Sequence, residues 1–313
     1  MGKSQLSISH LKMICTIVES DTVKQAAEKL FITQPALTNR IREAERRLNI
    51  SLFARRRRKL VITTAGKRLL QSATKILEEL ERAEYDIARL SDGIDQVLRI
   101  GLPHYASFKW LPNVVSYFHK ELPNIELEIM AEAAIDPLDS LYNGDVDIAL
   151  VSSRDKHLDI HKSDYDSAFI VQDELRACLS MKHKKTEQPF MSAEDFSTET
   201  YITNSTVPEK DREYELFFKP HNVLPYKVVQ VGFNEAIIEL VKVNMGLTIM
   251  SEQLVAPYLT DGAIKTMPLG DSGLKIYWHL VYLKSSKVAK HAKLLTNILK
   301  EHSSKQSSST LVY

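Results

Sequence analysis

The feature that most restricts the fold is a run of 29 residues, 64–92, that contains no proline and a single glycine. At 1.5 Å per residue, a helix of this length extends about 43 Å. Its apolar residues are separated by alternating steps of four and three, which is the spacing of one edge of a coiled-coil helix. Such a helix does not fill a globular core, so the run predicts a rod that pairs with a second copy of the chain. The alternative is a helix lying across another domain of its own chain. The residues of this apolar edge are Leu69, Ala73, Ile76, Leu80, Ala83, Ile87 and Leu90.

The charges are divided unevenly along the chain. Residues 1–68, the basic head, hold 15 Lys and Arg against 5 Asp and Glu. The rest of the chain holds 26 against 35, although the net charge of all 313 residues is only +1. A basic head on an acidic body favours a polyanion as the partner of the head alone. The length also predicts more than one domain.

The basic head shows the pattern of a winged helix-turn-helix. Residues 6–30 contain two short stretches with helical apolar spacing, and a third helix is predicted from Thr33 to Leu48. Pro35 fits its first turn, where a missing N–H costs no helical hydrogen bond. The segment "SLFARRRRKLVITTAG" then predicts two short strands joined by a basic tip, the wing. Three short helices with a tight turn before the third agree with this fold. The apolar face of the third helix is Leu37, Ile41, Ala44 and Leu48.

The opposite face of the third helix carries residue types that recognise duplex DNA. Gln34 and Asn39 can pair with base edges through their amides, and Arg42 can reach guanine or phosphate. Hydroxyls such as those of Thr33 and Thr38 suit phosphate oxygens. A solvated amphipathic helix beside an unrelated charge run is the alternative, which the wing directly behind the helix disfavours. The predicted DNA-binding residues are Thr33, Gln34, Pro35, Thr38, Asn39, Arg42, Arg46, Arg55, Arg56, Arg57 and Arg58.

Beyond residue 92, strand-like and helical segments alternate. This βαβ rhythm predicts mostly parallel sheets covered by helices, and the length favours two lobes with a cleft. In such sheets ligands bind at the carboxyl ends of the strands. Strands are predicted at 97–102, 125–130, 146–151, 174–180, 201–203, 227–232, 247–250 and 276–283, with helical segments at 111–122, 208–218 and 234–243.

Polar side chains follow several of these strands, in "PHYAS" (103–107), "SSRD" (152–155), "NSTV" (204–207) and "GFN" (232–234). Several of these loops precede a helix, whose free N–H groups favour an anionic ligand such as a carboxylate. No G-x-S-x-G surrounds the serines, and no glycine-rich loop follows a strand. We therefore expect a recognition site and no enzyme. The alternative is that these residues are ordinary loop residues.

The segments "AAEKL", "TQPALTNRI", "LFARRRRKLVIT" and "TAG" resemble, in order and spacing, the winged helix-turn-helix of the LysR-type transcriptional regulators. This chain departs from the family pattern at Ile14 (usually Phe), Thr22-Val23 (Ser-Phe), Ala44 (Leu) and Asn49 (Gly). The resemblance extends over about residues 5–300.

The resemblance implies a multidomain α/β protein with a two-lobed, Rossmann-like effector domain of the periplasmic-binding-protein type. The expected domains are 1–63, the DNA-binding head; 64–92, the dimerising linker helix; 93–302, the effector domain; and 303–313, a Ser-rich disordered tail. Lobe I would comprise 93–162 and 267–302, and lobe II 163–266.

Within the family, "LRIGLPHYASFKWLPNVVSYFHKELPNIELE", "LYNGDVDIALVSS", "FFKPHNVLPYKVVQV" and "VKVNMGLTIM" are most similar to regulators of methionine biosynthesis whose effector is homocysteine. The resemblance implies a regulator of methionine or sulfur metabolism genes that needs no cofactor and senses homocysteine or a related small amino acid. Because the loops at 104–105 and 203–209 differ, regulation of another pathway by another small carboxylate is the alternative. The implied effector contacts are Pro103, His104, Tyr105, Ser107, Ser152, Ser153, Thr203, Asn204, Phe233 and Asn234.

The expected partners are double-stranded promoter DNA and a second copy of the chain, paired through the linker helix. A homotetramer formed through the effector domains is also expected, and RNA polymerase is a further candidate partner. A solute-binding transport protein would share the two-lobed body, but it would need an export signal and would lack the basic head.

Charged residues interrupt the first thirty positions, and no stretch approaches the roughly 20 apolar residues of a membrane span. A cytoplasmic protein with no membrane contact is therefore expected. Cys15 and Cys178 lie far apart and are expected to be separate thiols. His157 and His161 stand near two aspartates, but the segment lacks a helical stripe, so we expect no metal there.

Overall fold

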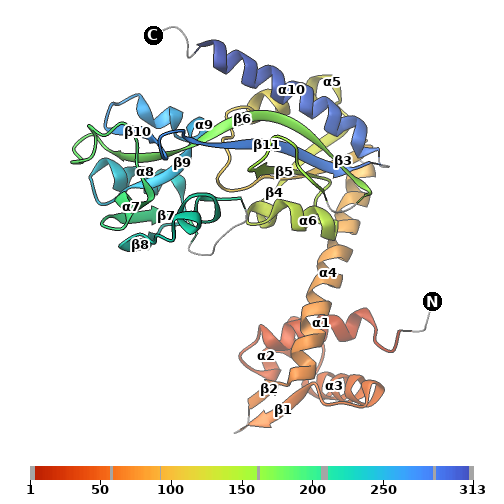
Figure 1. Cartoon of the computed structure of the whole chain (residues 1–313). Helices are drawn as coiled ribbons and strands as arrows, with labels where there is room; N and C mark the ends of the chain where they lie inside the picture. Colours follow the sequence, from red (N-terminus) through yellow and green to blue (C-terminus); the bar gives the residue numbers. More distant parts are fainter. Residues whose placement is uncertain are drawn as a thin grey trace. The chain divides into compact units, whose positions relative to one another are not determined.

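A computed structural model of the chain describes residues 4–56, 59–91, 93–160, 163–205, 211–284 and 287–309. The chain divides into two compact units, the head unit Met1–Gly93 and the body unit Ile94–Tyr313 (Figure 1). Within the described ranges, no helix combines the length and apolarity needed to cross a membrane.

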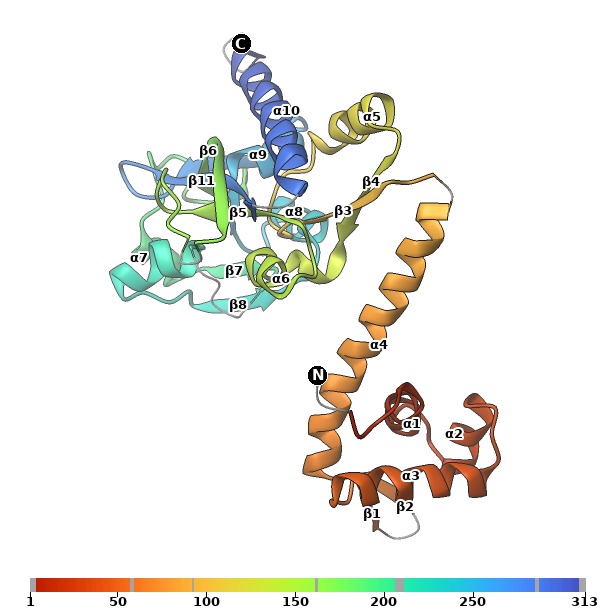
Figure 2. The ribbon, with the colours of Figure 1, turned by 90° about the vertical axis from the view of Figure 1, so that its right-hand side faces the viewer.

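The head unit is the predicted winged helix-turn-helix followed by a long helix (Figure 2). Thr22 and Thr33 begin the second and third helices, since each side chain accepts a hydrogen bond from a backbone N–H of the first turn. The third helix ends at Asn49 in the left-handed conformation, with φ of 52°. Asparagine tolerates this conformation better than most residues, which explains why it can replace the family's glycine. The elements are α1 (Ile8–Val18), α2 (Val23–Lys29), α3 (Gln34–Leu48), β1 (Phe53–Arg56), β2 (Lys59–Ile62) and α4 (Thr64–Ser91).

The predicted apolar face of α3 is confirmed. Leu37, Ile41 and Ala44 are buried in a core shared with α1 and α2, and Leu48 packs against it. This core holds the opposite face of α3 outward. β1 and β2 pair antiparallel from Phe53↔Ile62 to Arg56↔Lys59, so the strands of the predicted wing are also confirmed.

One short segment ties α3, the wing and α4 together. The Glu45 carboxylate on α3 accepts hydrogen bonds from the backbone N–H groups of Leu52 (2.8 Å) and Phe53 (3.1 Å). The Thr63 hydroxyl donates to the Leu52 carbonyl at 3.1 Å, next to the start of α4. Gly66 is required here, since a Cβ on it would lie 2.3 Å from the Leu52 oxygen. The orientation of α3 is thus fixed relative to the linker helix.

The apolar edge of α4 is divided between two environments, which corrects the prediction of one continuous pairing edge. Ala73 is buried in the core of the head unit, and Leu69 packs against that core. Further along, the side chains of Ile76, Ile87 and Leu90 are 47%, 62% and 55% exposed. The first turns of α4 therefore form part of the core of the head unit, because α1 packs along them. The edge that could pair with a second copy begins at Ile76.

The body unit contains a seven-stranded sheet in the order β10-β6-β11-β5-β3-β4, with β9 also paired to β6, and a separate parallel pair β7–β8. The strands are β3 (Gln96–Gly101), β4 (Ile125–Met130), β5 (Ile148–Ser153), β6 (Tyr165–Ser180), β7 (Thr200–Thr203), β8 (Lys227–Gln230), β9 (Thr248–Ser251), β10 (Ile264–Pro268) and β11 (Leu274–Leu283). The helices are α5 (Leu111–Glu121), η1 (Ala131–Ala134), α6 (Pro137–Asn143), α7 (Ala193–Phe196), η2 (Tyr214–Phe218), η3 (Lys219–His221), α8 (Asn234–Lys242), α9 (Glu252–Val255), η4 (Ala256–Leu259) and α10 (Val288–Ser309).

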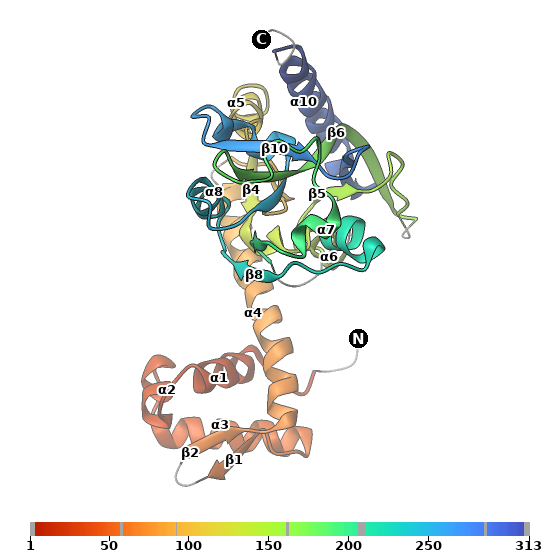
Figure 3. The ribbon, with the colours of Figure 1, turned by 60° about the vertical axis from the view of Figure 1, so that its left-hand side comes forward.

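The prediction of mostly parallel sheets is wrong for the large sheet. β3 pairs in parallel with β4 and β5, as βαβ units require, but β11 is antiparallel to both β5 and β6. β9 and β10 also pair antiparallel with β6. The reason is that β6 and β11 run through the unit in opposite directions and connect its two lobes (Figures 1 and 3). The predicted strand 174–180 is only the second half of β6, and β10 was not predicted.

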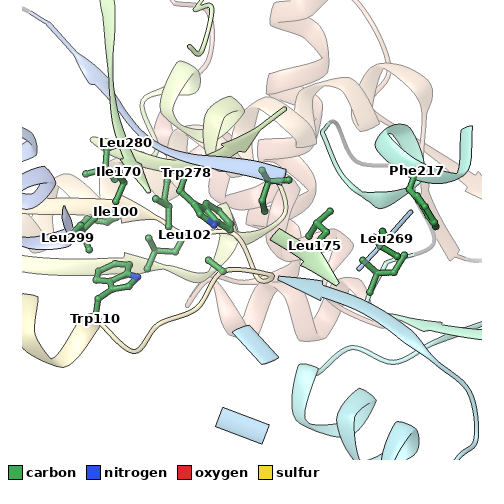
Figure 4. Packing of buried hydrophobic residues seen from close by; sticks show 14 of the residues in the cluster. Ile100, Leu102, Trp110, Ile170, Leu175, Phe217, Leu269, Trp278, Leu280 and Leu299 are labelled. Atoms are coloured by element: carbon green, nitrogen blue, oxygen red, sulfur yellow. The ribbon is translucent and has the colours of Figure 1, made fainter. Parts of the chain in front are cut away.

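Lobe I is built on β3, β4 and β5, and lobe II on β7–β10. The sequence predicted the lobe boundary after residue 162. In the structure the chain passes from lobe I to lobe II inside β6, and at this crossing Leu175 pairs with both Leu274 and Ser251. One hydrophobic cluster follows this crossing (Figure 4). In it, Trp278 and Leu175 lie between Ile100 and Leu102 on one side and Phe217 and Leu269 on the other (Figure 4). The shared cluster supports both lobes.

The sequence predicted a disordered tail from residue 303, but α10 continues to Ser309 in the structure. Residues 310–313 lie outside the described ranges. The polar end of this helix follows turns anchored by Ala292, Leu295 and Leu299, which are buried in the main cluster. Both cysteines are unpaired, as expected. Complete burial raises the pKa of the Cys178 thiol to about 12, which makes it unreactive at neutral pH.

Candidate DNA-binding face and ligand cleft

A groove of about 450 Å³ lies between α3 and the wing in the head unit. Four of the predicted DNA-binding residues meet in its lining, Gln34, Thr38 and Arg42 from α3 and Arg55 from β1. Gln34, Arg42 and Arg55 are exposed. The Gln34 amide and the guanidinium groups of Arg42 and Arg55 therefore face one groove, the arrangement expected for a helix that enters a major groove beside a wing.

The other predicted residues of this face have varied surroundings. The Thr33 hydroxyl caps α3 by accepting from Ala36 N at 3.3 Å, and the Thr38 hydroxyl donates to Gln34 O at 3.0 Å. Pro35, Asn39 and Arg46 are exposed on α3. The backbone of Arg56 ends β1, and Arg57 and Arg58 lie outside the described residues.

Replacing Asn39 or Gln34 with alanine is expected to relax base preference while leaving phosphate-driven binding unchanged. Each amide can form a bidentate pair that is worth about 1–3 kcal/mol of base discrimination. Binding measured on a set of singly substituted operator fragments should show the ratio between best and worst base falling about tenfold at one position. The slope of log affinity against log salt should stay the same. A uniform loss on all fragments would contradict a base-reading role.

The body unit contains a small cavity of about 20 Å³ where the two lobes meet. Four of the predicted effector contacts line it, namely Tyr105 after β3, Thr203 and Asn204 at the end of β7, and Asn234 at the start of α8. The remaining lining residues are Leu175, Arg212, Ile237, Thr248, Ile249, Met250 and Leu254. Residues from six separate segments thus form one small, partly polar site, the ligand cleft.

Contacts cross the ligand cleft from one lobe to the other. The Asn234 amide of lobe II donates to the His104 carbonyl of lobe I at 2.9 Å, and it accepts from the Asn204 amide at 3.3 Å. The Arg212 guanidinium lies 3.9 Å above the ring centre of Tyr105. The Tyr105 hydroxyl is 3.4 Å from that of Ser152. Movement of either lobe would therefore change these polar contacts.

The other predicted effector contacts do not line this cleft. Ser153 is buried and its hydroxyl donates to Asp155 O at 2.6 Å and lies 3.1 Å from His279 Nε2. Burial lowers the pKa of His279, so this histidine is neutral at pH 7. Ser107 lines a second cavity of about 20 Å³, and Phe233 is 75% exposed. Pro103 is buried, and the His104 imidazole contacts the Ala134 carbonyl at 3.0 Å.

Sequence reasoning missed Arg212 and the wall formed by Thr248, Ile249 and Met250. Arg212 stands in a charged stretch that suggested a solvated helix, yet its side chain is 8% exposed and lines the cleft. The wall belongs to β9, whose burial pattern alone does not reveal a ligand surface. Within the described ranges, no group of three or more His, Cys, Asp or Glu could hold a metal ion. His161 lies outside those ranges.

A winged helix-turn-helix with an exposed polar groove, joined to a two-lobed domain with a small cleft, defines a transcriptional regulator controlled by a small ligand. This chain belongs to the LysR family. Residues 8–67 match the family model "Bacterial regulatory helix-turn-helix protein, lysR family", and residues 91–304 match "LysR substrate binding domain".

Among its relatives, the regulator MetR of Haemophilus influenzae is 27% identical over 274 residues, which cover 88% of this chain and 87% of MetR. MetR of Escherichia coli K12 is 25% identical over 269 residues, covering 85% and 81% of the two chains. These relatives are transcriptional regulators, and the chain is not an enzyme.

Solved structures agree in fold. Full-length CbnR in complex with its target DNA superposes with a TM-score of 0.65 at 17% identity, over 95% of this chain and 98% of CbnR. The regulatory domain of MetR from N. meningitidis superposes with a TM-score of 0.58 at 23% identity, over 66% and 93%.

Proposed function

We propose that this regulator binds promoter DNA through the groove between α3 and the wing and responds to homocysteine or a closely related small amino acid. Its targets would be genes of methionine or sulfur metabolism. The observation that carries the proposal is the ligand cleft, in which Tyr105 of lobe I meets amides and hydroxyls of lobe II beside a short apolar wall. The likeness to MetR over most of the chain supports the choice of ligand.

The head supports DNA as the partner. Its excess of Lys and Arg gives a positive surface potential, which accelerates encounter with DNA and makes binding dependent on salt. Gln34, Asn39, Arg42 and Arg55 supply both base-reading and phosphate-binding groups. The domain boundaries predicted from the sequence and the roles of these residues form part of the proposal, as does action in the cytoplasm, where promoter DNA is accessible.

The proposed assembly is a homodimer formed through the exposed part of the α4 edge, from Ile76 onward. A homotetramer would form through the effector domains. β4 is the last strand of the large sheet, and the neighbouring α5 exposes Val115 and Tyr117, so this edge suits a second copy. RNA polymerase remains a further proposed partner of the promoter-bound assembly.

Titration calorimetry tests the choice of ligand. The full-length protein is expected to bind L-homocysteine more tightly than L-methionine or L-cysteine. Replacing Asn204 with alanine removes a polar group that lines the cleft and should weaken binding about tenfold, a typical effect of one lost hydrogen bond. Asn143→Ala is the matched control, since Asn143 is exposed and lies outside the cleft lining. If homocysteine does not bind but another small carboxylate does, the regulator serves a different pathway.

A further inference from the structure

Among the residues of the described ranges that line the ligand cleft, Arg212 is the one with a charged side chain. We infer that Arg212 selects the effector by its carboxylate and couples that carboxylate to the contact between the lobes. This inference rests on the proposed function, because it concerns the same cleft. It restricts the ligand class to a short-chain acid, whose negative charge is recognised by a residue of lobe II.

The position of Arg212 is fixed by its neighbours. Its Nε donates to the Glu213 carboxylate at 2.9 Å, and the other oxygen of that carboxylate accepts from the Tyr201 hydroxyl, also at 2.9 Å. Arg212, Glu213 and Tyr201 are all less than 10% exposed. A guanidinium is planar, so the hydrogen bond from Nε to Glu213 fixes the orientation of the whole group. Little side-chain entropy is then lost when a ligand carboxylate binds.

The rest of the lining matches the other parts of a short amino acid. Thr203, Asn204, Asn234 and Thr248 provide hydroxyls and amides that can bind an ammonium or other polar group. Ile249, Met250 and Leu254 provide an apolar wall for a short side chain such as a thioether. The start of α8, at Asn234, adds backbone N–H groups that favour negative charge. The cleft thus combines a cation, a polar group and an apolar wall.

Arg212 also contacts the opposite lobe. Its guanidinium lies 3.9 Å above the Tyr105 ring, in the loop that follows β3 of lobe I, which is within the range of a cation–π interaction. A carboxylate that binds Arg212 acts directly on this contact between lobes. A ligand shifts the equilibrium between two arrangements of the lobes only if it binds them with different affinities. Because Arg212 lies at the contact between the lobes, a carboxylate bound to it would have different affinities for arrangements with and without this contact.

The test compares acids with their uncharged amides on the full-length protein. The probes are L-homocysteine, L-methionine, and the 2-oxo and 2-hydroxy acids with the methionine side chain, each beside its carboxamide. On the wild type we expect the acids to bind about 30-fold more tightly than the amides, as charge-assisted hydrogen bonds predict. In Arg212→Gln this preference should fall below about threefold, and Arg212→Lys should keep part of it. A thermal unfolding transition measured without ligand, compared with that of the wild type, verifies that the body unit of each variant is folded.

The outcomes separate this inference from the proposed function. If the wild type binds acids and amides equally, or if Arg212→Gln keeps the preference, the inference is overturned and the regulator assignment stands. If an acid other than homocysteine binds with a preference that depends on Arg212, the inference holds and the homocysteine assignment fails. If no acid in the panel binds, both the inference and the proposed effector class are rejected, while the DNA-binding result still reports on the head.

Discussion

The double variant Ile76→Asp/Ile87→Asp is expected to lose pairing through the linker helix, which halves the mass of the sedimenting assembly, and to bind its operator at least about 100-fold more weakly than the wild type. Both side chains lie on the exposed part of the α4 edge, and neither belongs to the core of the head unit. Two carboxylates placed in a helix pair would be buried without partners, at a cost that exceeds the gain from pairing. The head should remain folded, because its core ends before Ile76 apart from contact with Leu77.

The loss of DNA affinity follows from geometry. Two heads held by one rod bind two half-sites about 34–36 Å apart as a unit, so the second head binds at a high effective concentration. A monomer retains only the affinity of a single head. Analytical ultracentrifugation and mobility shift on the same samples measure both effects.

The matched control for this prediction is Gln71→Asp/Ala88→Asp, which places the same two carboxylates at exposed positions of α4 away from the apolar edge. It should remain dimeric and bind DNA normally. An assembly of unchanged mass in the Ile76/Ile87 variant would show that the chain does not need this edge of α4 for pairing. Both variants leaving the dimer intact would reject the linker as the interface.

The second large effect is expected from Arg42→Ala/Arg55→Ala, which should lower operator affinity about 100-fold at moderate salt and reduce the salt slope. Both guanidinium groups are exposed in the groove between α3 and the wing. Each phosphate contact contributes close to 0.9 to the slope of log affinity against log salt, so two lost contacts reduce it by about 1.8. If Arg42 binds guanine instead, the reduction is about 0.9 and base preference changes at one position.

Lys109→Ala/Lys120→Ala controls for the loss of two positive charges elsewhere, since both lysines are exposed in the body unit. Its salt slope should equal that of the wild type. An unchanged slope in the Arg42/Arg55 variant would mean that the groove does not bind the DNA backbone. Fluorescence anisotropy at a series of salt concentrations is sufficient to measure these slopes.

Most of the head unit could be predicted because its structure is encoded locally. Thr33 and Pro35 define the start of α3, and the spacing of Leu37, Ile41 and Ala44 defines its buried face. The wing required only two short strands around a basic tip. The division of the α4 edge was not predictable, because the spacing that suits pairing with a second copy also suits packing against α1.

The body unit was harder to predict because its decisive contacts join distant residues. Local patterns located most strands, including β4 (Ile125–Met130) at its observed bounds. They did not show that β11 pairs antiparallel with residues 165–175 of β6 and that these two strands connect the lobes. Of the cleft residues, Tyr105 and Asn234 could be found at strand ends. Arg212 could not, since nothing in its own segment distinguishes it from a solvated arginine.

The amino-acid sequence by itself determined the order of the parts: a basic three-helix head with a wing, a long helix with one apolar edge, and an acidic body of alternating strands and helices. Helical period, capping residues and charge are local properties, so they can be deduced without coordinates. Only the tertiary structure decided which side chains share the ligand cleft and where the apolar edge of α4 becomes exposed. The physical reason is that burial and contacts between distant residues, as between Arg212 and Tyr105 in the cleft wall, depend on the neighbours that the fold supplies.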